Sequence, residues 1–161
     1  MPTPINPLLD LHFERPVALP KEKIWQAWTT PALITQWFTP NPWKTIECEI
    51  DLRPGGIFST LMQSPEGQNF PNMGCFLEII PNQRLVWTNA FEPGFRPAKI
   101  DDTMFAFTGI IELSDHPEGT LYSATVMHGD TDSCHKHNSM GFHQGWGAAL
   151  DQLVALMQQH Q

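Results

Sequence analysis

The stretch that decides the fold is residues 135–161, HKHNSMGFHQGWGAALDQLVALMQQHQ. At about 100° per residue its bulky apolar side chains share one helical face, and they are Phe142, Trp146, Leu150, Leu153 and Met157. A second face carries mainly small residues and includes Gly141, Gly145, Ala148 and Gln152. We call it the bare face. This pattern predicts a long helix that packs its bulky face on a sheet. The bare face either leaves room for a ligand or packs tightly against a neighbour.

The chain before this helix has mainly the pattern of strands. Apolar and polar residues alternate over residues 9–14, which predicts a half-buried strand that Pro16 and Pro20 end. Pro20 and then Thr30-Pro31 are typical helix starts and predict two short helices. About six strands with tight turns follow, so neighbouring strands should be antiparallel. The order predicts an α+β fold, with a curved antiparallel sheet of about seven strands wrapped on a long C-terminal helix.

The totals argue against several classes of function. The 161 residues fit one domain, which we expect to span residues 1–161, and 41% hydrophobic residues can build a substantial core. The net charge of −8 argues against nucleic acid and anionic membranes as partners, because both bind basic surfaces. No apolar run reaches the roughly 18 residues of a membrane span, and the first ten residues lack a secretory signal pattern. Three sparse cysteines are typical of a reducing compartment, so we expect a cytoplasmic protein.

Aromatic side chains are plentiful on the expected strands and near the junction of helices and sheet. They suit the lining of a cavity for a small apolar molecule, although most of them suit a filled core equally well. Arg96, between Phe95 and Pro97 in a long loop, is a candidate anchor for a carboxylate. The expected ligand-binding residues are Trp37, Trp43, Phe58, Phe76, Trp87, Phe91, Arg96, Phe105, Phe107, Gly141 and Gly145.

Histidines and acids gather just before the last helix. The alternation of the preceding strand points His128 inward, so His128 and His137 are candidates for acid–base catalysis on a carbonyl-bearing substrate. The alternative is a hydrogen-bonded histidine at a strand end, because no nucleophile or partner carboxylate is recognisable from the spacing. Cys134, His135, His137 and His143 match no zinc-binding spacing, so we expect no metal and no cofactor.

Four segments of the chain resemble a known family. They are VALPKEKIWQAWTTPALITQWFTP (17–40), EIDLRPGG (49–56), GCFLEIIPNQRLVWT (74–88) and HNSMGFHQGWGAALDQL (137–153). Together they resemble the activator-of-heat-shock-ATPase homologues (AHSA-type) of the START-like, or helix-grip, superfamily, also called SRPBCC, over about residues 11–157. The resemblance implies a helix-grip fold with a deep cavity beneath the last helix. Members of the superfamily bind lipids, hormones or polyketides, and some catalyse cyclisation or dehydration.

Three functions are open on this reading. The first, which we rank highest, is binding of a small hydrophobic molecule in a cavity between the sheet and the C-terminal helix. The second is a cofactor-free enzyme of the polyketide cyclase or dehydratase type. The third is an interaction protein, either a homodimer or a chaperone accessory factor. The resemblance weighs against a co-chaperone, because the eukaryotic protein carries an additional N-terminal domain for which this chain has no room.

Overall fold

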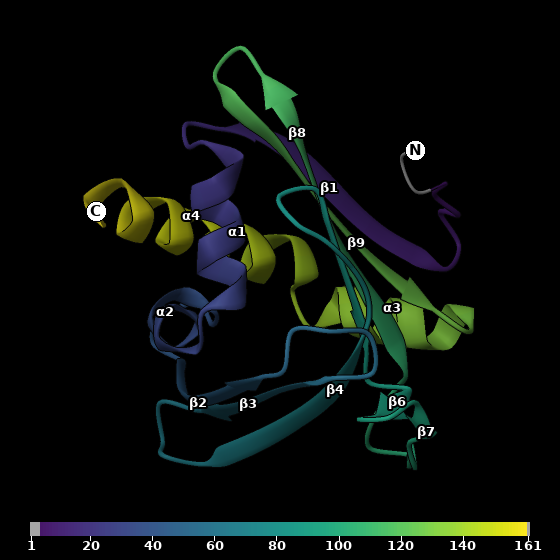
Figure 1. The fold of residues 1–161 in the computed structure, drawn as a ribbon. Helices are drawn as coiled ribbons and strands as arrows, with labels where there is room; N and C mark the ends of the chain where they lie inside the picture. The colour runs from purple at the N-terminus through teal and green to yellow at the C-terminus, as the bar shows by residue number, and fades with distance from the viewer. Residues whose placement is uncertain (1–3, 161) are drawn as a thin grey trace.

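The computed structural model describes residues 4–160, which form nine strands and four helices (Figure 1). In chain order the elements are β1 (Asp10–Val17), α1 (Lys21–Thr29), α2 (Pro31–Trp37), β2 (Lys44–Ile50), β3 (Ile57–Gln63), β4 (Asn69–Ile80), β5 (Arg84–Thr88), β6 (Phe91–Glu92), β7 (Arg96–Pro97), β8 (Phe107–His116), β9 (Gly119–His128), α3 (Thr131–Ser139) and α4 (Phe142–Gln159).

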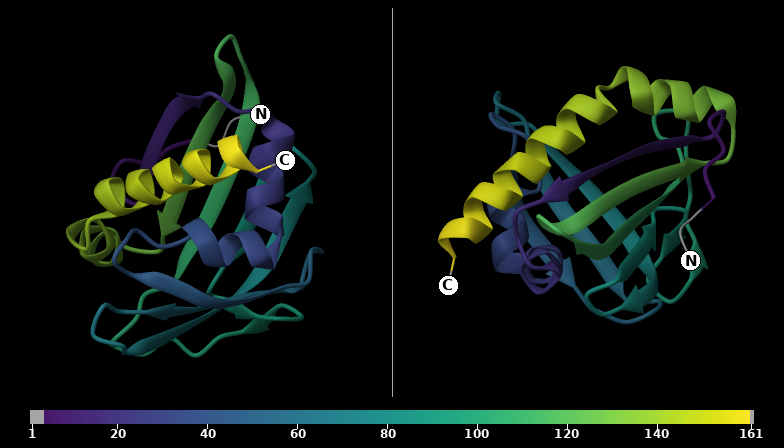
Figure 2. Two further views of the ribbon diagram at one scale, coloured as in Figure 1. Left: turned by 90° about the vertical axis from the view of Figure 1, so that its left-hand side faces the viewer. Right: turned by 90° about the horizontal axis from the view of Figure 1, so that it is seen from above.

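Seven strands form one antiparallel sheet in the order β1-β9-β8-β5-β4-β3-β2, and β6 and β7 form a separate two-stranded ribbon. Helices α1 and α2 connect β1 with β2, which are the two edge strands of the sheet. Figure 2 shows α4 running across one face of the curved sheet, with α1 and α2 beside it. The structure therefore confirms the predicted α+β helix-grip fold.

Strand β1 continues past the residue at which the sequence pattern ends it. Pro16 pairs with Leu121 of β9, and the strand ends at Val17. Proline has no N–H to donate to a ladder, but an edge strand needs donors on one side only. The pattern of residues 9–14 does not reveal that β1 lies at an edge. The strand includes Pro16 and ends at Val17, before Pro20, so its end lies between the two prolines that the sequence pattern predicts to end it.

The predicted continuous C-terminal helix is divided into α3 and α4. Gly141 lies between them with φ = +88°. This left-handed conformation favours glycine, because a Cβ there crowds the backbone. Gly141 therefore belongs to a turn and does not extend the bare face of α4. The bulky face is buried as predicted, through Phe142, Leu150, Leu153 and Met157.

The main core fills the space between the sheet and helices α1, α2 and α4. Two of its tryptophans donate the hydrogen bond of their indole N–H to a partner inside the protein. Trp28 donates from Nε1 to Oη of Tyr122 at 3.2 Å, and Trp37 donates from Nε1 to the carbonyl oxygen of Ala27 at 3.0 Å. Burial raises the pKa of Tyr122, so its hydroxyl stays protonated. Neither indole N–H is available to a ligand.

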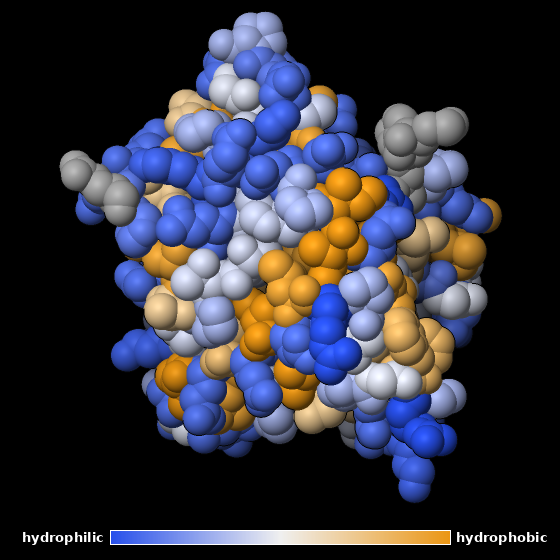
Figure 3. Space-filling view, viewed as in Figure 1, coloured by the Kyte–Doolittle hydropathy of each residue, from blue (hydrophilic) through white to orange (hydrophobic). Residues whose placement is uncertain are grey.

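Apolar side chains also reach the surface. Figure 3 shows them as a band across the face of the molecule that Figure 1 displays. The exposed large apolar residues include Met73, Ile80, Phe95 and Met127. Within residues 4–160, no helix is long and apolar enough to cross a membrane.

Candidate functional site

Three aromatic residues stand side by side on the sheet face that packs against α4. Phe58, Phe76 and Trp87 come from the neighbouring strands β3, β4 and β5, and none is more than 5% exposed. Phe58 stacks on Phe76 with ring centroids 5.2 Å apart and meets Trp87 edge-on at 5.4 Å. These expected ligand-binding residues form one continuous aromatic floor.

Helical residues extend this floor into an uninterrupted series of ring contacts. Phe38, directly after α2, lies 5.8 Å from Phe58. Trp146 of α4 stacks parallel to Trp87, with centroids 6.4 Å apart and planes inclined by 8°. Phe142 lies 5.1 Å from Trp146. We call Phe38, Phe58, Trp87, Trp146 and Phe142 the aromatic row.

The flat placement of Trp87 depends on a missing side chain. Trp87 of β5 pairs with Gly109 of β8, and a Cβ at Gly109 would lie 2.6 Å from Cζ2 of Trp87. No side chain fits at that distance, so the indole occupies the space over Gly109. The ring can then lie along the sheet and face Trp146.

The Nε1 atom of Trp87 is not completely enclosed by the protein. Trp87 is 5% exposed, and within the described residues its Nε1 has no hydrogen-bond partner. Within residues 4–160, every side-chain nitrogen or oxygen that is inaccessible to solvent has a hydrogen-bond partner. Nε1 of Trp87 has none, so its N–H must be accessible to solvent. A buried indole with a free donor is costly unless water or a ligand can reach it.

The first turns of α4 cover the row thinly. Trp146 is only half-buried, and a glycine lies on each side of it. A Cβ at Gly147 would meet nothing within 4 Å, and one at Gly145 would meet only Cγ of Pro40 at 3.9 Å. Packing does not require either glycine, although each weakens a helix by about 1 kcal/mol relative to alanine.

Two histidines meet at the end of the row. His128, the last residue of β9, is 7% exposed, as the strand alternation predicts, and its Nδ1 lies 2.8 Å from the carbonyl oxygen of Leu9. A carbonyl oxygen only accepts, so Nδ1 of His128 carries the proton and Nε2 of the neutral ring accepts. His137 of α3 lies with Nδ1 2.9 Å from that Nε2 and must be the donor.

Aromatic rings surround His137. Its ring centroid lies 4.9 Å from that of Phe105, 5.5 Å from that of Phe107 and 5.8 Å from that of Phe142. Burial, followed by repulsion from His128 when that ring is protonated, lowers the pKa of His137 to about 4. His137 is therefore neutral near pH 7 and is a weak base. Phe142 also belongs to the aromatic row, so the histidine pair adjoins it directly.

Two local structures hold this end in place. Asn89 donates from Nδ2 to the carbonyl oxygen of Phe105 at 3.0 Å, and its Oδ1 accepts from the backbone N–H of Phe107 at 2.8 Å. Asp130 caps α3 by accepting from the backbone N–H of Ser133 at 2.7 Å. The two hydrogen bonds of Asn89 fix the segment from Phe105 to Phe107, and the cap at Asp130 fixes the start of the helix that carries His137.

Three of the expected ligand-binding residues have no ring contact with the aromatic row or with His137. Trp43 is 37% exposed and packs on Phe70, with centroids 5.5 Å apart. Phe91 and Arg96 belong to the β6–β7 ribbon, where Phe91 contacts Phe95 at 6.4 Å and Arg96 is exposed. The structure does not bring these side chains together with Trp87 or His137.

Part of the bare face of α4 packs tightly. Gln152 donates from Nε2 to the carbonyl oxygens of Trp37 at 3.0 Å and Thr39 at 2.8 Å, and its Oε1 accepts from the backbone N–H of Asn41 at 2.9 Å. Gly145 approaches Pro40 on the same segment. The chain between α2 and β2 therefore lies on this face and occupies space that a ligand would need.

The sequence pattern missed Phe38, Phe142 and Trp146 as candidates for the site. It places Phe142 and Trp146 on the bulky face of the last helix, where both read as ordinary core residues. The signal that marks the position of Trp146 is the pair Gly145 and Gly147, because two glycines weaken the helical turn that carries the indole. No comparable signal marks Phe38.

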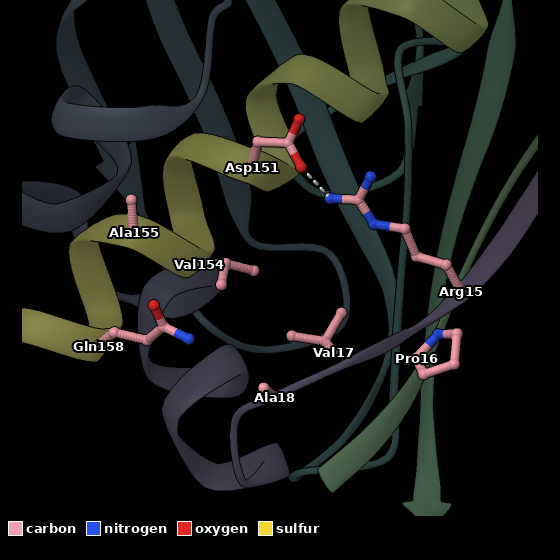
Figure 4. Close-up of a pocket in the computed structure, with 8 residues that line it drawn as sticks. All are labelled: Arg15, Pro16, Val17, Ala18, Asp151, Val154, Ala155 and Gln158. Carbon is pink, nitrogen blue, oxygen red and sulfur yellow. Dashed lines mark hydrogen bonds and ion pairs between the residues drawn. The ribbon is translucent and has the colours of Figure 1, made fainter. Parts of the chain in front are cut away.

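Two hollows among residues 4–160 open on the surface, and neither is lined by residues of the aromatic row. One, of about 400 Å³, lies between β1 and α4, where Arg15 pairs with Asp151 at 2.5 Å (Figure 4). The other, of about 520 Å³, lies between the turn at Pro54 and the turn at Pro93. The aromatic row itself is occupied by side chains in contact, so a ligand must enter where its cover is thin.

The histidines, cysteines and acids near residue 134 do not converge. Among the described residues, no group of three or more such side chains is placed to hold a metal ion. Cys134 is buried, and Asp130 is engaged as the cap of α3. The structure gives these residues roles in packing and capping.

Comparisons with known proteins agree with the fold described above. The model of the Activator of Hsp90 ATPase homolog 1-like protein family matches residues 18–158. A solved protein of Nitrosomonas europaea is 44% identical, with a TM-score of 0.91, and the match covers 96% of this chain and 97% of that one. A protein of Rhodobacter sphaeroides is 21% identical with a TM-score of 0.80 over 93% of each chain, which shows a shared fold. None of the curated proteins matches the chain.

Proposed function

This chain belongs to the family of activator of Hsp90 ATPase homolog 1-like proteins, and on that premise we propose that it binds a small aromatic molecule at the aromatic row. Membership of the family supports a ligand-binding fold. The observation that carries the proposal is the indole N–H of Trp87, which has no partner among the described residues and yet reaches solvent from a residue that is 5% exposed. A largely apolar surface with one free donor is the usual make-up of a ligand site.

The cover of the row supports entry of a ligand beside Trp146. Gly145 and Gly147 weaken the first turns of α4, and local openings occur where a helix has few packed contacts. Movement of Trp146 away from Trp87 would uncover the face of a buried indole. A flat ring placed there would replace the stacking contact that Trp146 makes, which is worth about 0.5–1.5 kcal/mol. The ligand class is therefore flat and aromatic.

The geometry supports binding better than acid–base catalysis. His137 is the accessible member of the histidine pair, and its pKa of about 4 makes it a poor base for carbon acids. The thiol of Cys48 is no nucleophile either, because burial raises its pKa to about 11. Neither group is tuned for proton transfer or covalent chemistry near neutral pH.

A titration with 4-methylanisole, a small aromatic ether, tests the proposal. We expect saturable binding by NMR, and we expect Trp146→Ala to strengthen it about two- to tenfold, because the ligand no longer has to displace the Trp146 ring from Trp87. Trp43→Ala is the matched control, since Trp43 lies outside the aromatic row. Absence of binding to the wild-type protein, or the same change in affinity in both variants, would contradict the proposal.

A further inference from the structure

The histidine pair at the end of the aromatic row has its protons fixed by hydrogen bonding. The carbonyl oxygen of Leu9 holds the proton of His128 on Nδ1, and Nε2 of His128 then holds the proton of His137 on Nδ1. One backbone carbonyl thus sets the tautomers of both neutral rings. Nε2 of His137 is left as an acceptor.

This acceptor is open and is set among aromatic rings. Nε2 of His137 has no hydrogen-bond partner within residues 4–160. Every side-chain nitrogen in those residues that is inaccessible to solvent has a partner, so Nε2 of His137 must be accessible to solvent. Phe105, Phe107 and Phe142 surround the ring. Three aromatic rings therefore have their centroids within 5.8 Å of the centroid of the imidazole that carries this acceptor.

We propose that Nε2 of His137 accepts a hydrogen bond from the ligand, so that the site selects hydroxylated aromatic molecules, the phenol class, over relatives without a donor. The inference rests on the proposed function, because the aromatic row supplies the surface for the ring. His137 is a positioning and specificity residue in this account, with His128 and Leu9 fixing its orientation.

The hydrogen bond is neutral and involves no proton transfer. A phenol ordinarily has a pKa of about 10, and the pKa of His137 is lowered to about 4. Transfer of the proton to the imidazole is therefore strongly unfavourable, and the ligand keeps its O–H. The pair acts as an acceptor of fixed direction and not as a general base.

A matched pair of probes tests the selection. p-Cresol and its methyl ether, 4-methylanisole, share the ring, but only p-cresol can donate. We expect the wild-type protein to bind p-cresol about five- to tenfold more tightly than 4-methylanisole. His137→Phe should abolish that difference by weakening p-cresol binding alone, because phenylalanine keeps an aromatic ring but has no acceptor.

The outcomes separate the two proposals. If neither probe binds, the proposed function fails and this inference fails with it. If both bind equally, or if His137→Phe keeps the preference for p-cresol, the inference alone is overturned.

A measurement on the wild-type protein removes any dependence on the folding of the variant. Long-range ¹H–¹⁵N correlation spectra distinguish protonated from unprotonated ring nitrogens. We expect His137 to carry its proton on Nδ1 at pH 7, and the Nε2 signal to move on addition of p-cresol but not of 4-methylanisole. A proton on Nε2 in the free protein would contradict the inference.

Discussion

Nε2 of His128 lies 2.9 Å from Nδ1 of His137, and this contact joins the last residue of β9 to the last turn of α3. His128 is held in turn by the carbonyl oxygen of Leu9, just before β1. Three segments of the chain thus meet through two imidazole rings. The contact requires that Nε2 of His128 carry no proton, because two N–H groups would otherwise face each other.

Acid should destabilise the protein through His137. The folded-state pKa is lowered from 6.5 to about 4, so the folded protein binds fewer protons than the unfolded chain between these values. Stability is therefore unaffected above pH 6.5 and falls as the pH drops toward 4, by roughly 1–3 kcal/mol. The groups near His137 are His128 on β9, Lys136 on α3, whose Nζ lies 5.9 Å from the Phe105 ring, and His143 beside Phe142.

Denaturant unfolding at several pH values measures this effect. The variant His137→Phe should show a flatter fall in free energy of unfolding between pH 6.5 and 4 than the wild-type protein. The capping carboxyl of Asp130 has a lowered pKa, mainly through hydrogen bonds to Ser133, so its loss of charge falls at lower pH and is common to both proteins. Parallel curves for the two proteins would show that His137 is protonated equally in the folded and unfolded states.

Alanine at two glycines of the last segment should have opposite effects. Gly147→Ala should raise the free energy of unfolding by about 0.5–1 kcal/mol, because its Cβ meets nothing and alanine favours the helix. Gly141→Ala should lower it by about 1–2 kcal/mol, because its φ of +88° disfavours any Cβ. Chemical unfolding of both variants checks the signs. Equal destabilisation would mean that α4 is packed more closely around Gly147 than the structure has it.

Gly109 should tolerate no side chain. In Gly109→Ala the new Cβ would overlap the Trp87 indole, because it would lie 2.6 Å from Cζ2 of Trp87. Displacement of Trp87 should cost about 1–3 kcal/mol and weaken 4-methylanisole binding. Unfolding and binding measured on the same sample link the two effects. A variant with unchanged stability would show that Trp87 does not lie over β8.

Gln152 should contribute to stability more than its exposure suggests. Gln152→Ala removes three hydrogen bonds to the segment between Trp37 and Asn41, and each is worth about 0.5–1.5 kcal/mol. We therefore expect a loss of about 1–3 kcal/mol in thermal or chemical unfolding. Gln158→Ala on the same helix is the control, because Gln158 is exposed. Similar losses in both variants would count against this role.

The sequence was sufficient for the architecture, because periodicity reports directly on which face of an element is buried. The stripe from Phe142 to Met157 and the inward alternation of His128 both hold in the structure. Periodicity could not predict the break between α3 and α4 at Gly141, because a helical pattern continues on both sides of this residue. Only the backbone angle of Gly141 reveals the turn. The pairing of Pro16 within β1 was not predictable from the pattern either, because it depends on β1 being at an edge of the sheet.

The candidate site was predictable only in part, because it depends on contacts between distant segments. Strand alternation finds Phe58, Phe76 and Trp87, whose neighbouring strands bring them together. It cannot find that Gln152 holds the chain after α2, or that His128 meets His137. Trp43 has the same aromatic character as Trp87 but packs on Phe70 outside the aromatic row, and residue type alone does not separate the two.

The most direct test of the account is to follow the six tryptophan indole N–H signals by NMR during titration with 4-methylanisole. We predict that the signals of Trp87 and Trp146 shift and saturate together, while those of Trp43 and of Trp28, whose N–H is bonded to Tyr122, move little. Titration without movement of the Trp87 signal, or with shifts confined to Trp43, would contradict the claim that the aromatic row binds the ligand.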